Sequence, residues 1–287
     1  EEGQDYYVTE DQVKSLLKPR GRFSPKGSYG HALIIGGSYG KVGAALMCAQ
    51  SALRTGCGLL SMYVPRCGYI PIQAAFPEAM LLVDKNEEYI QEFPALGAFK
   101  AVGVGIGLGQ AGPTAAAFLA FLAAAPADLA MVLDADAINI VAQHQDILSR
   151  IPKNTILSPH PKELARLLGP WADDFEKMVK VRAFTEKNKL IVIVKGANTA
   201  IVLPSGKVYY NSTGNPGMAT AGAGDVLTGM LTSLLAQGYT GADAALLAVY
   251  LHGLAGDLAS QALGQRSLIA TDIIKNIGQA YLMLEKL

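Results

Sequence analysis

Short apolar segments alternate along this chain with segments whose apolar residues recur at helical spacing, and this alternation restricts the fold more than any other feature. Helical periodicity at residues 44–54 and 114–125 lies between strand-like segments. The predicted strands are residues 32–35, 59–64, 101–105, 129–133, 155–157 and 190–194. Strands that alternate with helices favour a parallel sheet covered by helices. The sequence therefore predicts an α/β fold with a mainly parallel central sheet flanked by helices.

The pattern changes towards both ends of the chain. Residues 200–203 and 207–210 flank the turn Pro204, Ser205 and Gly206, which predicts an antiparallel hairpin. Further helices are predicted at residues 8–17, 226–235, 242–260 and 272–284. Because residues 18–28 are rich in proline and glycine, they predict a connecting loop. We therefore expect an N-terminal segment or linker over residues 1–25 and one domain over residues 26–287.

The composition indicates a small-molecule partner. Of the 287 residues 51% are hydrophobic, and the net charge is zero without a long run of lysine or arginine. This allows a large core and argues against nucleic-acid or membrane partners, since the most apolar stretch, residues 114–125, is too short to cross a bilayer. Cys48, Cys57 and Cys67 form no CxxC pair, and the four histidines lack metal-ligand spacing. These features predict a reducing cytoplasm and no metal site made by the protein alone.

A glycine-rich turn, NPGMATAGAGD at residues 215–225, leads directly into the helix predicted at residues 226–235. Gly222 and Gly224 permit close backbone approach, and the first N–H groups of a helix attract an anion. Asp225 is placed to accept a proton from a hydroxyl held beside that anion. The motif predicts a phosphate site with a carboxylate base. The alternative is an ordinary turn in which Asp225 caps the helix.

Polar and glycine residues follow five of the predicted strands. They are Gly36 and Gly37, residues 105–109, Asp134 and Asp136, residues 158–160, and residues 195–199. In an open α/β sheet, ligands collect outside the carboxyl ends of the strands. We therefore expect these five loops to converge on one cleft.

Two of these loops suggest nucleotide or ligand contact. The KGANT loop offers the Lys195 ammonium and the Thr199 hydroxyl to nucleotide phosphates, although its spacing is not that of a Walker A loop and a plain turn is the alternative. His160 stands between two prolines, whose stiff backbone fixes the direction of its imidazole ring. Contact with a ligand and a purely structural role are about equally favoured for it. His252, inside a predicted helix, is interpreted as a packing residue.

The remaining loops each allow two interpretations. Asp134 and Asp136 either hold water or Mg²⁺ through an outer shell or cap the following helix. The alternating glycines of residues 102–109 either lie against a planar ligand or allow close chain packing. The GGSYGKVG loop lacks GxGxxG spacing and a following acidic residue, so we expect it to contact substrate, with Ala44 allowing close approach, or simply to pack.

Taken together, several motifs resemble the ADP/ATP-dependent NAD(P)H-hydrate dehydratases in order and approximate spacing. They are KGSYGHALIIGGS, the GAA of residues 43–45, DADAIN, LSPHPKELARLL, VKGANT and NPGMATAGAGDVLTG. The resemblance spans the chain from Lys26 onward and implies a ribokinase-like three-layer sandwich. It also implies dehydration of the 6S hydrate of NADH or NADPH, in which ADP or ATP phosphorylates the ring hydroxyl and phosphate is then eliminated.

The resemblance further implies roles for individual residues. Asp225 is the expected catalytic base, with an anion hole formed by Gly222, Ala223 and Gly224. Ala223 stands where many relatives carry a hydroxyl residue. Mg²⁺ is expected to arrive with the nucleotide, without a direct protein ligand. Nucleotide binding is expected from Lys195, Gly196, Ala197, Asn198, Thr199 and Gly224, and substrate binding from Ala44, Gly107, His160, Asn215 and Asp225.

The resemblance also suggests a homo-oligomer, a tetramer in many relatives. Residues 8–27 look like the joint that follows an NAD(P)H-hydrate epimerase domain in a bifunctional chain. Two other functions stay open on the sequence. One is a ribokinase-like kinase of a hydroxymethyl vitamin precursor or a sugar, and the other is a nucleotide sensor without catalysis.

Overall fold

Ten strands form one sheet in the computed structural model, which describes residues 5–285. The sheet order is β1-β10-β9-β8-β7-β6-β5-β2-β3-β4. The strands are β1 (Asp5–Tyr7), β2 (His31–Ile35), β3 (Leu59–Val64), β4 (Met80–Val83), β5 (Ala101–Val104), β6 (Ala130–Leu133), β7 (Ile156–Leu157), β8 (Ile191–Val194), β9 (Ala200–Val202) and β10 (Val208–Tyr210). Strand β9 pairs antiparallel with β8 and β10, and the other pairings among the described residues are parallel. The mainly parallel sheet and the hairpin are both confirmed.

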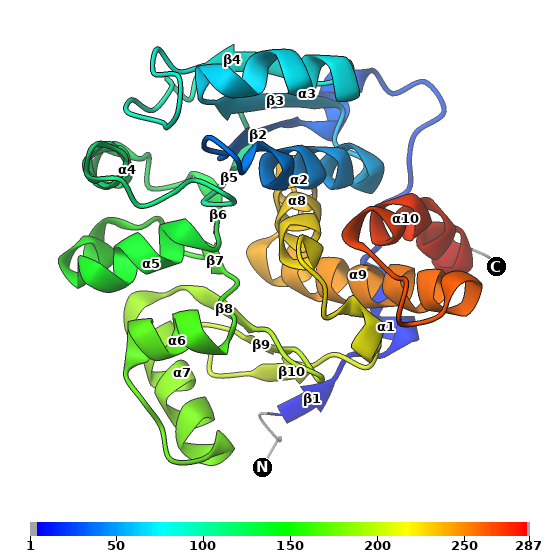
Figure 1. Cartoon of the computed structure of the whole chain (residues 1–287). Coiled ribbons are helices and arrows are strands. Elements are labelled where there is room, and N and C mark those ends of the chain that lie inside the picture. The colour runs from blue at the N-terminus through cyan, green and yellow to red at the C-terminus, as the bar shows by residue number, and fades with distance from the viewer. Residues whose placement is uncertain (1–4, 286–287) are drawn as a thin grey trace.

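Helices cover both faces of this sheet (Figure 1). The longer helices are α1 (Glu10–Leu16), α2 (Val42–Thr55), α3 (Tyr69–Ala75), α4 (Gly112–Ala124), α5 (Asp136–Gln143), α6 (Pro161–Leu168), α7 (Asp174–Asn188), α8 (Ala223–Ala236), α9 (Gly241–Leu263) and α10 (Ala270–Glu285). Along β2, Ile34 packs with the residues of α2, α8, α9 and α10, whereas Leu33 packs with those of α4 to α7. This alternation produces two cores, and the three-layer sandwich is confirmed.

The N-terminal segment contributes to the fold. Strand β1 pairs with β10, and the side chains of Val8 and Val13 are buried. Helix α1 packs against α9 and α10. The domain boundary at residue 26 stays a prediction, but residues 5–16 extend the sheet and one core.

Helix α9 is both long and apolar, with 23 residues. Within residues 5–285 it is the one helix long and apolar enough to cross a bilayer, and 67% of its most apolar window is buried inside the protein. A central core helix has these properties as well. Its place between α8 and α10 is that of a core helix.

The topology places the site. The carboxyl ends of β6, β7 and β8 lie side by side, and they are followed by Asp134, His160 and Lys195. Helix α8 packs against β5 and β6 and starts at this edge of the sheet. Side chains from separate parts of the chain therefore meet around the first turn of α8.

Candidate active site

A pocket of about 930 Å³ opens where the carboxyl ends of β6 to β8 meet the first turn of α8. Its charged lining residues are Asp134, His160, Glu163, Lys195 and Asp225. Its apolar lining residues include Met218, Leu227 and Val249. The lining therefore offers both charged groups suited to phosphate and apolar surface suited to a flat organic group.

The first turn of α8 is shaped by Gly222, which precedes it with φ of 91°. A Cβ atom at Gly222 would lie 2.6 Å from Cε of Met47, so a side chain there would require Met47 to move and would strain the backbone at this positive φ. The helix has no side-chain cap, which makes the interpretation of Asp225 as a helix cap wrong. Residues 222–225 line the pocket. The Ala223 N–H donates to the Thr220 carbonyl oxygen over a long 3.4 Å, and the Val226 N–H closes the first helical hydrogen bond to Gly222 over 3.0 Å. The N–H groups at the start of a helix are suited to binding an anion.

Asp225 is largely buried in this pocket, and its carboxyl group is poised to exchange a proton near neutral pH. Burial raises the pKa of Asp225 to about 7, the negative charge of Asp134 adds to the rise, and the Lys195 ammonium opposes it. A general base works best when its pKa is close to the working pH. Asp225 therefore has both the position and the proton affinity of a base.

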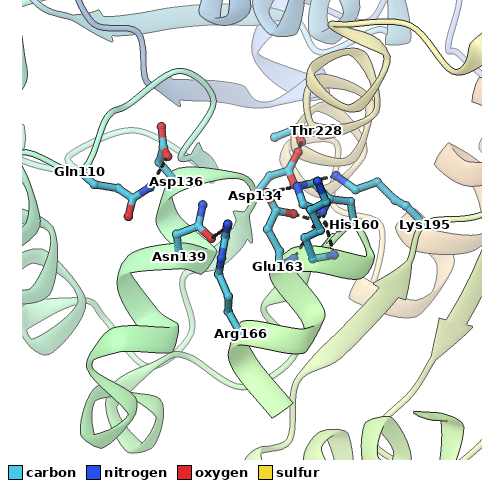
Figure 2. Close-up of polar contacts among 10 residues, drawn as sticks. Gln110, Asp134, Asp136, Asn139, His160, Glu163, Arg166, Lys195 and Thr228 are labelled. Atoms are coloured by element: carbon cyan, nitrogen blue, oxygen red, sulfur yellow. Dashed lines mark hydrogen bonds and ion pairs between the residues drawn. The ribbon is translucent and has the colours of Figure 1, made fainter. Parts of the chain in front are cut away.

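Asp134, Lys195 and Thr228 form one polar network (Figure 2). Asp134 and Lys195 are close enough to Asp225 for their charges to act on its carboxyl group. The Lys195 Nζ donates to Oδ1 of Asp134 over 2.9 Å, and the Thr228 hydroxyl donates to Oδ2 over 2.8 Å. Asp134 is 2% exposed. Its negative charge is thus held deep in the site and is compensated by one ammonium group.

His160 has a structural role at the start of α6, and its contact with a ligand stays a prediction. It lines the pocket, and its Nδ1 accepts hydrogen bonds from the backbone N–H groups of Lys162 (3.1 Å) and Glu163 (3.3 Å) at the start of α6. The Glu163 carboxylate accepts the backbone N–H of His160 over 2.9 Å in return. Burial raises the pKa of Glu163, with a further contribution from Asp134. His160 is therefore rigidly held at the rim of the pocket.

Asp136 points away from the pocket (Figure 2). It accepts the backbone N–H of Gly109 over 2.8 Å and the side-chain amide of Gln110 over 2.9 Å. Helix α5 has Ala135 as its N-cap and no side-chain cap, so the prediction that Asp134 and Asp136 cap this helix is wrong. Their two carboxylates serve different loops.

The glycines of residues 102–109 allow close chain packing. A Cβ atom at Gly103 would lie 2.4 Å from Oγ1 of Thr232, and one at Gly105 would lie 1.9 Å from the carbonyl oxygen of Asp134. These two positions face protein atoms, so the interpretation as a surface for a planar ligand is wrong there. The packing alternative is confirmed for Gly103 and Gly105.

Ala44 and Gly107 lie together but do not line the pocket. A Cβ atom at Gly107 would lie 3.2 Å from Cβ of Ala44. Ala44 and Met47 are one turn apart on α2, and Met47 touches Gly222, so the pair lies near the first turn of α8. Of the five loops expected to converge, those after β6, β7 and β8 line this pocket.

The KGANT loop divides two cavities. Lys195, Gly196, Ala197 and Thr199 line the pocket beside α8. Asn198 instead lines a neighbouring cavity of about 660 Å³ between this loop and α7. The predicted Asn215 does line the main pocket, and its side-chain amide donates to Asp257 over 2.9 Å.

Sequence reasoning missed site residues that come from helices. His252 of α9 lines the pocket, its buried Nε2 has no hydrogen-bond partner within the described residues, and burial lowers its pKa to about 4. Glu163, Thr228 and Asp257 were also missed. The i, i+3 spacing of His160 and Glu163 was the one available signal, since it matches a capping box.

The cysteines and possible metal-ligating groups were also located in the described residues. Cys48, Cys57 and Cys67 are all free. Over residues 5–285, no group of three or more His, Cys, Asp or Glu side chains is arranged to hold a metal ion.

Comparison with known proteins shows the family to which the chain is related. The profile of the NAD(P)H-hydrate dehydratase family matches residues 32–279. The chain is 38% identical to the bifunctional NAD(P)H-hydrate repair enzyme Nnr of Moorella thermoacetica, over 93% of this chain and 52% of that protein. It is 37% identical to the ADP-dependent (S)-NAD(P)H-hydrate dehydratase of Neisseria meningitidis, over 87% of this chain and 83% of that protein. The chain thus spans about half the length of the first of these relatives.

Solved structures agree with the sequence comparisons. An ADP/ATP-dependent NAD(P)H-hydrate dehydratase from Bacillus subtilis, co-crystallised with ATP and Mg²⁺, has a TM-score of 0.82 and 28% identity over 98% of this chain and 99% of that one. A ribokinase-like superfamily protein from Enterococcus faecalis has a TM-score of 0.85 and 24% identity over 98% and 96%. The second likeness concerns the fold alone and confirms the ribokinase-like prediction.

Proposed function

The chain belongs to the NAD(P)H-hydrate dehydratase family, and from this membership we propose that it dehydrates the 6S hydrate of NADH or NADPH at the expense of ADP or ATP. The observation that supports this most directly is the Asp225 carboxylate, with a pKa of about 7, beside Lys195 in a pocket at a helix N-terminus. Hydroxide is a poor leaving group. A site that first phosphorylates the hydroxyl solves this problem.

In the first step, Asp225 accepts the proton of the ring hydroxyl while the hydroxyl oxygen attacks the terminal phosphorus of the nucleotide. The new O–P bond forms as the bond from phosphorus to the bridging oxygen breaks, and the nucleotide departs one phosphate shorter. The backbone N–H groups of Gly222, Ala223 and Gly224 and the Lys195 ammonium stabilise the charge on the moving phosphoryl group. The Ala223 N–H would exchange its long contact with the Thr220 carbonyl oxygen, 3.4 Å, for a phosphate oxygen.

In the second step, the ring nitrogen expels phosphate from the neighbouring carbon. The C–O bond breaks with both electrons leaving on the phosphate oxygen, and loss of a proton from the next ring carbon restores the dihydronicotinamide. A net lyase reaction therefore begins with a kinase step.

The charged and apolar lining residues of the pocket suggest where the parts of the nucleotide would lie. Its phosphates would lie at Lys195 and the first turn of α8, with Gly196, Ala197, Asn198 and Thr199 along the chain beside them. The base would lie towards Met218 and Val249. The hydrated ring would lie beside Asp225, and His160, Asn215, Ala44 and Gly107 are its proposed contacts.

Mg²⁺ fits this arrangement as a companion of the nucleotide. The donors in the pocket are carboxylate oxygens, which are hard ligands of the kind Mg²⁺ prefers, but they do not form a complete cage among residues 5–285. Asp134 and Glu163 would face its water ligands. When bound, the ion would neutralise phosphate charge.

The surroundings of the enzyme belong to the same proposal. We expect a cytoplasmic protein that forms a homo-oligomer, a tetramer by analogy with relatives. The bifunctional repair enzymes among its relatives support the idea that this domain is joined to an NAD(P)H-hydrate epimerase domain.

The decisive experiment is incubation of the purified chain with the 6S hydrate, Mg²⁺ and either ADP or ATP. We expect the absorbance of the reduced nicotinamide to return together with an equal amount of inorganic phosphate. A stable phosphorylated alcohol without phosphate release would support the alternative kinase, and nucleotide binding without turnover would support a sensor. The 6R hydrate serves as the substrate control.

A further inference from the structure

Asp134 has a position in the site that the two proposed chemical steps leave unexplained. It touches neither the hydroxyl nor the phosphoryl group in the scheme above, yet it is 2% exposed and lies beside Asp225, the proposed base. Burying a carboxylate is costly unless it serves a purpose or is well paired. Both of its oxygens accept hydrogen bonds from groups of the site, Lys195 and Thr228.

We propose that Asp134 is a positioning residue for phosphoryl transfer, which holds the Lys195 ammonium at the first turn of α8 and supplies a fixed negative charge beside Asp225. The inference rests on the proposed function for its chemical meaning. Its two physical parts, a held ammonium and a nearby charge, are measurable without turnover.

The first part follows from the geometry of Lys195. A lysine ammonium has three N–H donors on a flexible four-carbon chain. One donor is used on Asp134 over 2.9 Å, which leaves the others for phosphate oxygens. A Cβ atom at Gly224 would lie 3.3 Å from Nζ of Lys195 and 3.8 Å from Oδ2 of Asp134. Both groups therefore lie next to the backbone of Gly224, which belongs to the proposed anion hole. Anchoring the ammonium there removes the need to order it when a nucleotide binds.

Thr228 completes the anchor. Its hydroxyl bonds Oδ2 of Asp134 over 2.8 Å and lies 3.2 Å from the carbonyl oxygen of Gly224, one turn earlier in α8. The carboxylate is therefore fixed to α8 on one side and holds Lys195 on the other. Figure 2 shows Thr228 above the Asp134 side chain and Lys195 reaching it from the right.

The second part follows from the charges around Asp225. Asp134 raises the pKa of Asp225 and Lys195 lowers it, after the larger effect of burial. The titratable and charged groups that face this region are Asp134 after β6, Lys195 after β8, His160 and Glu163 of α6, His252 of α9 and Cys48 of α2. Among them, Asp134 and Lys195 act on Asp225 with opposite signs, so removing each should shift its titration in opposite directions.

The experiment is a carboxyl carbon NMR titration of Asp225 together with nucleotide binding by calorimetry, on the full chain without hydrate. For Asp134→Asn we expect the midpoint of Asp225 to fall by about one pH unit or more. We also expect nucleotide affinity to fall by about tenfold, because Lys195 loses its anchor. For Lys195→Met we expect the midpoint to rise, since the charge of Asp134 is then uncompensated.

Asp136→Asn is the matched control, because it removes the same charge two residues along the chain from a side chain that faces Gly109. It should leave the midpoint of Asp225 unchanged. An unchanged or raised midpoint in Asp134→Asn, or unchanged nucleotide affinity, would show that the ion pair is structural only. If Asp134→Asn does not fold, Lys195→Met decides the matter, since a midpoint that stays or falls would overturn the proposal. These readouts need no hydrate, so a failed dehydratase assay would sink the proposed function and not this inference.

Discussion

The two walls near Asp225 differ in how their polar groups are used. The wall formed by α8 and the KGANT loop presents charged side chains and the N–H groups of a helix end to an open pocket. The wall formed by Ala44 and Gly107 satisfies its polar groups internally. The Ser38 hydroxyl donates to the Gly107 carbonyl over 2.8 Å, and the Gly109 N–H donates to Asp136 over 2.8 Å.

This difference suggests a division of labour. A wall with unpaired donors and compensated charges attracts an anion and responds strongly when a charge is removed. A wall with internally paired groups discriminates by shape, because it offers close backbone approach and little charge. Mutations in the first wall should therefore alter turnover and nucleotide use, and mutations in the second should alter use of the hydrate.

The strongest way to break this comparison is the Asp225→Asn substitution. We expect turnover to fall by about 10² or more, the usual scale for loss of a general base, while nucleotide still binds. The assay is recovery of reduced nicotinamide absorbance, with nucleotide affinity measured separately. Asp146→Asn, an exposed carboxylate outside the pocket, is the control. Turnover within twofold of the parent enzyme would remove Asp225 from the mechanism.

A smaller effect is expected for Lys195→Ala. The nucleotide KM should rise by about tenfold or more, since a charge-assisted hydrogen bond to phosphate is lost, and the KM of the hydrate should change little. Steady-state kinetics with each substrate varied in turn measures both values. Lys153→Ala is the control, because Lys153 is exposed and precedes the N-terminal end of β7, away from the site. A change confined to the hydrate KM would reverse the assignment of the two walls.

Much of this fold was predictable because its strands are buried and regularly spaced. Strand β3 and the β9–β10 hairpin begin and end close to their predicted positions. Strands β1 and β4 were missed, since each is an edge strand of three or four mostly exposed residues whose conformation depends on a neighbour. Helices α6 and α7 were missed as well, although the capping box of α6 was readable in hindsight.

The site was predictable where it follows strands. The topology brings Asp134, His160 and Lys195 together because parallel strands end at one edge of the sheet. His252 and Thr228 were not predicted, since which helical residues face the pocket depends on how α8 and α9 pack. The loops after β2 and β5 were predicted to reach the same cleft only because they follow the carboxyl ends of strands. That position does not determine the path of a loop whose polar groups form hydrogen bonds within the protein.

Gly107→Ala sharpens the comparison on the other wall. Gly107 has φ of 60°, and its Cβ would lie 2.7 Å from the carbonyl oxygen of Lys41, so the wall must shift. We expect the KM of the hydrate to rise by about fivefold, which corresponds to roughly 1 kcal/mol, while the nucleotide KM stays unchanged. Gly112→Ala is the matched control, because a Cβ there meets no atom within 4 Å. An equal rise in both KM values would show that the two walls are not separate.

The last expected effect concerns stability, and it tests whether the buried carboxyl group of Asp225 is costly to the folded protein. The pKa of Asp225 is about 7 in the folded chain, against about 4 in an unfolded one. Below pH 4 the carboxyl is protonated in both states and has no effect. As pH rises from about 4 to about 7, the unfolded chain alone releases the proton, so the free energy of unfolding falls and then stays low.

Asp225→Asn removes this loss, so its free energy of unfolding relative to the parent should be greater at pH 8 than at pH 5. Asp136→Asn removes a carboxylate that does not line the pocket, and it is the control, for which we expect no such gain. Urea unfolding at the two pH values measures the difference, and the same relative stability of Asp225→Asn at both would mean that Asp225 ionises as easily in the pocket as in water.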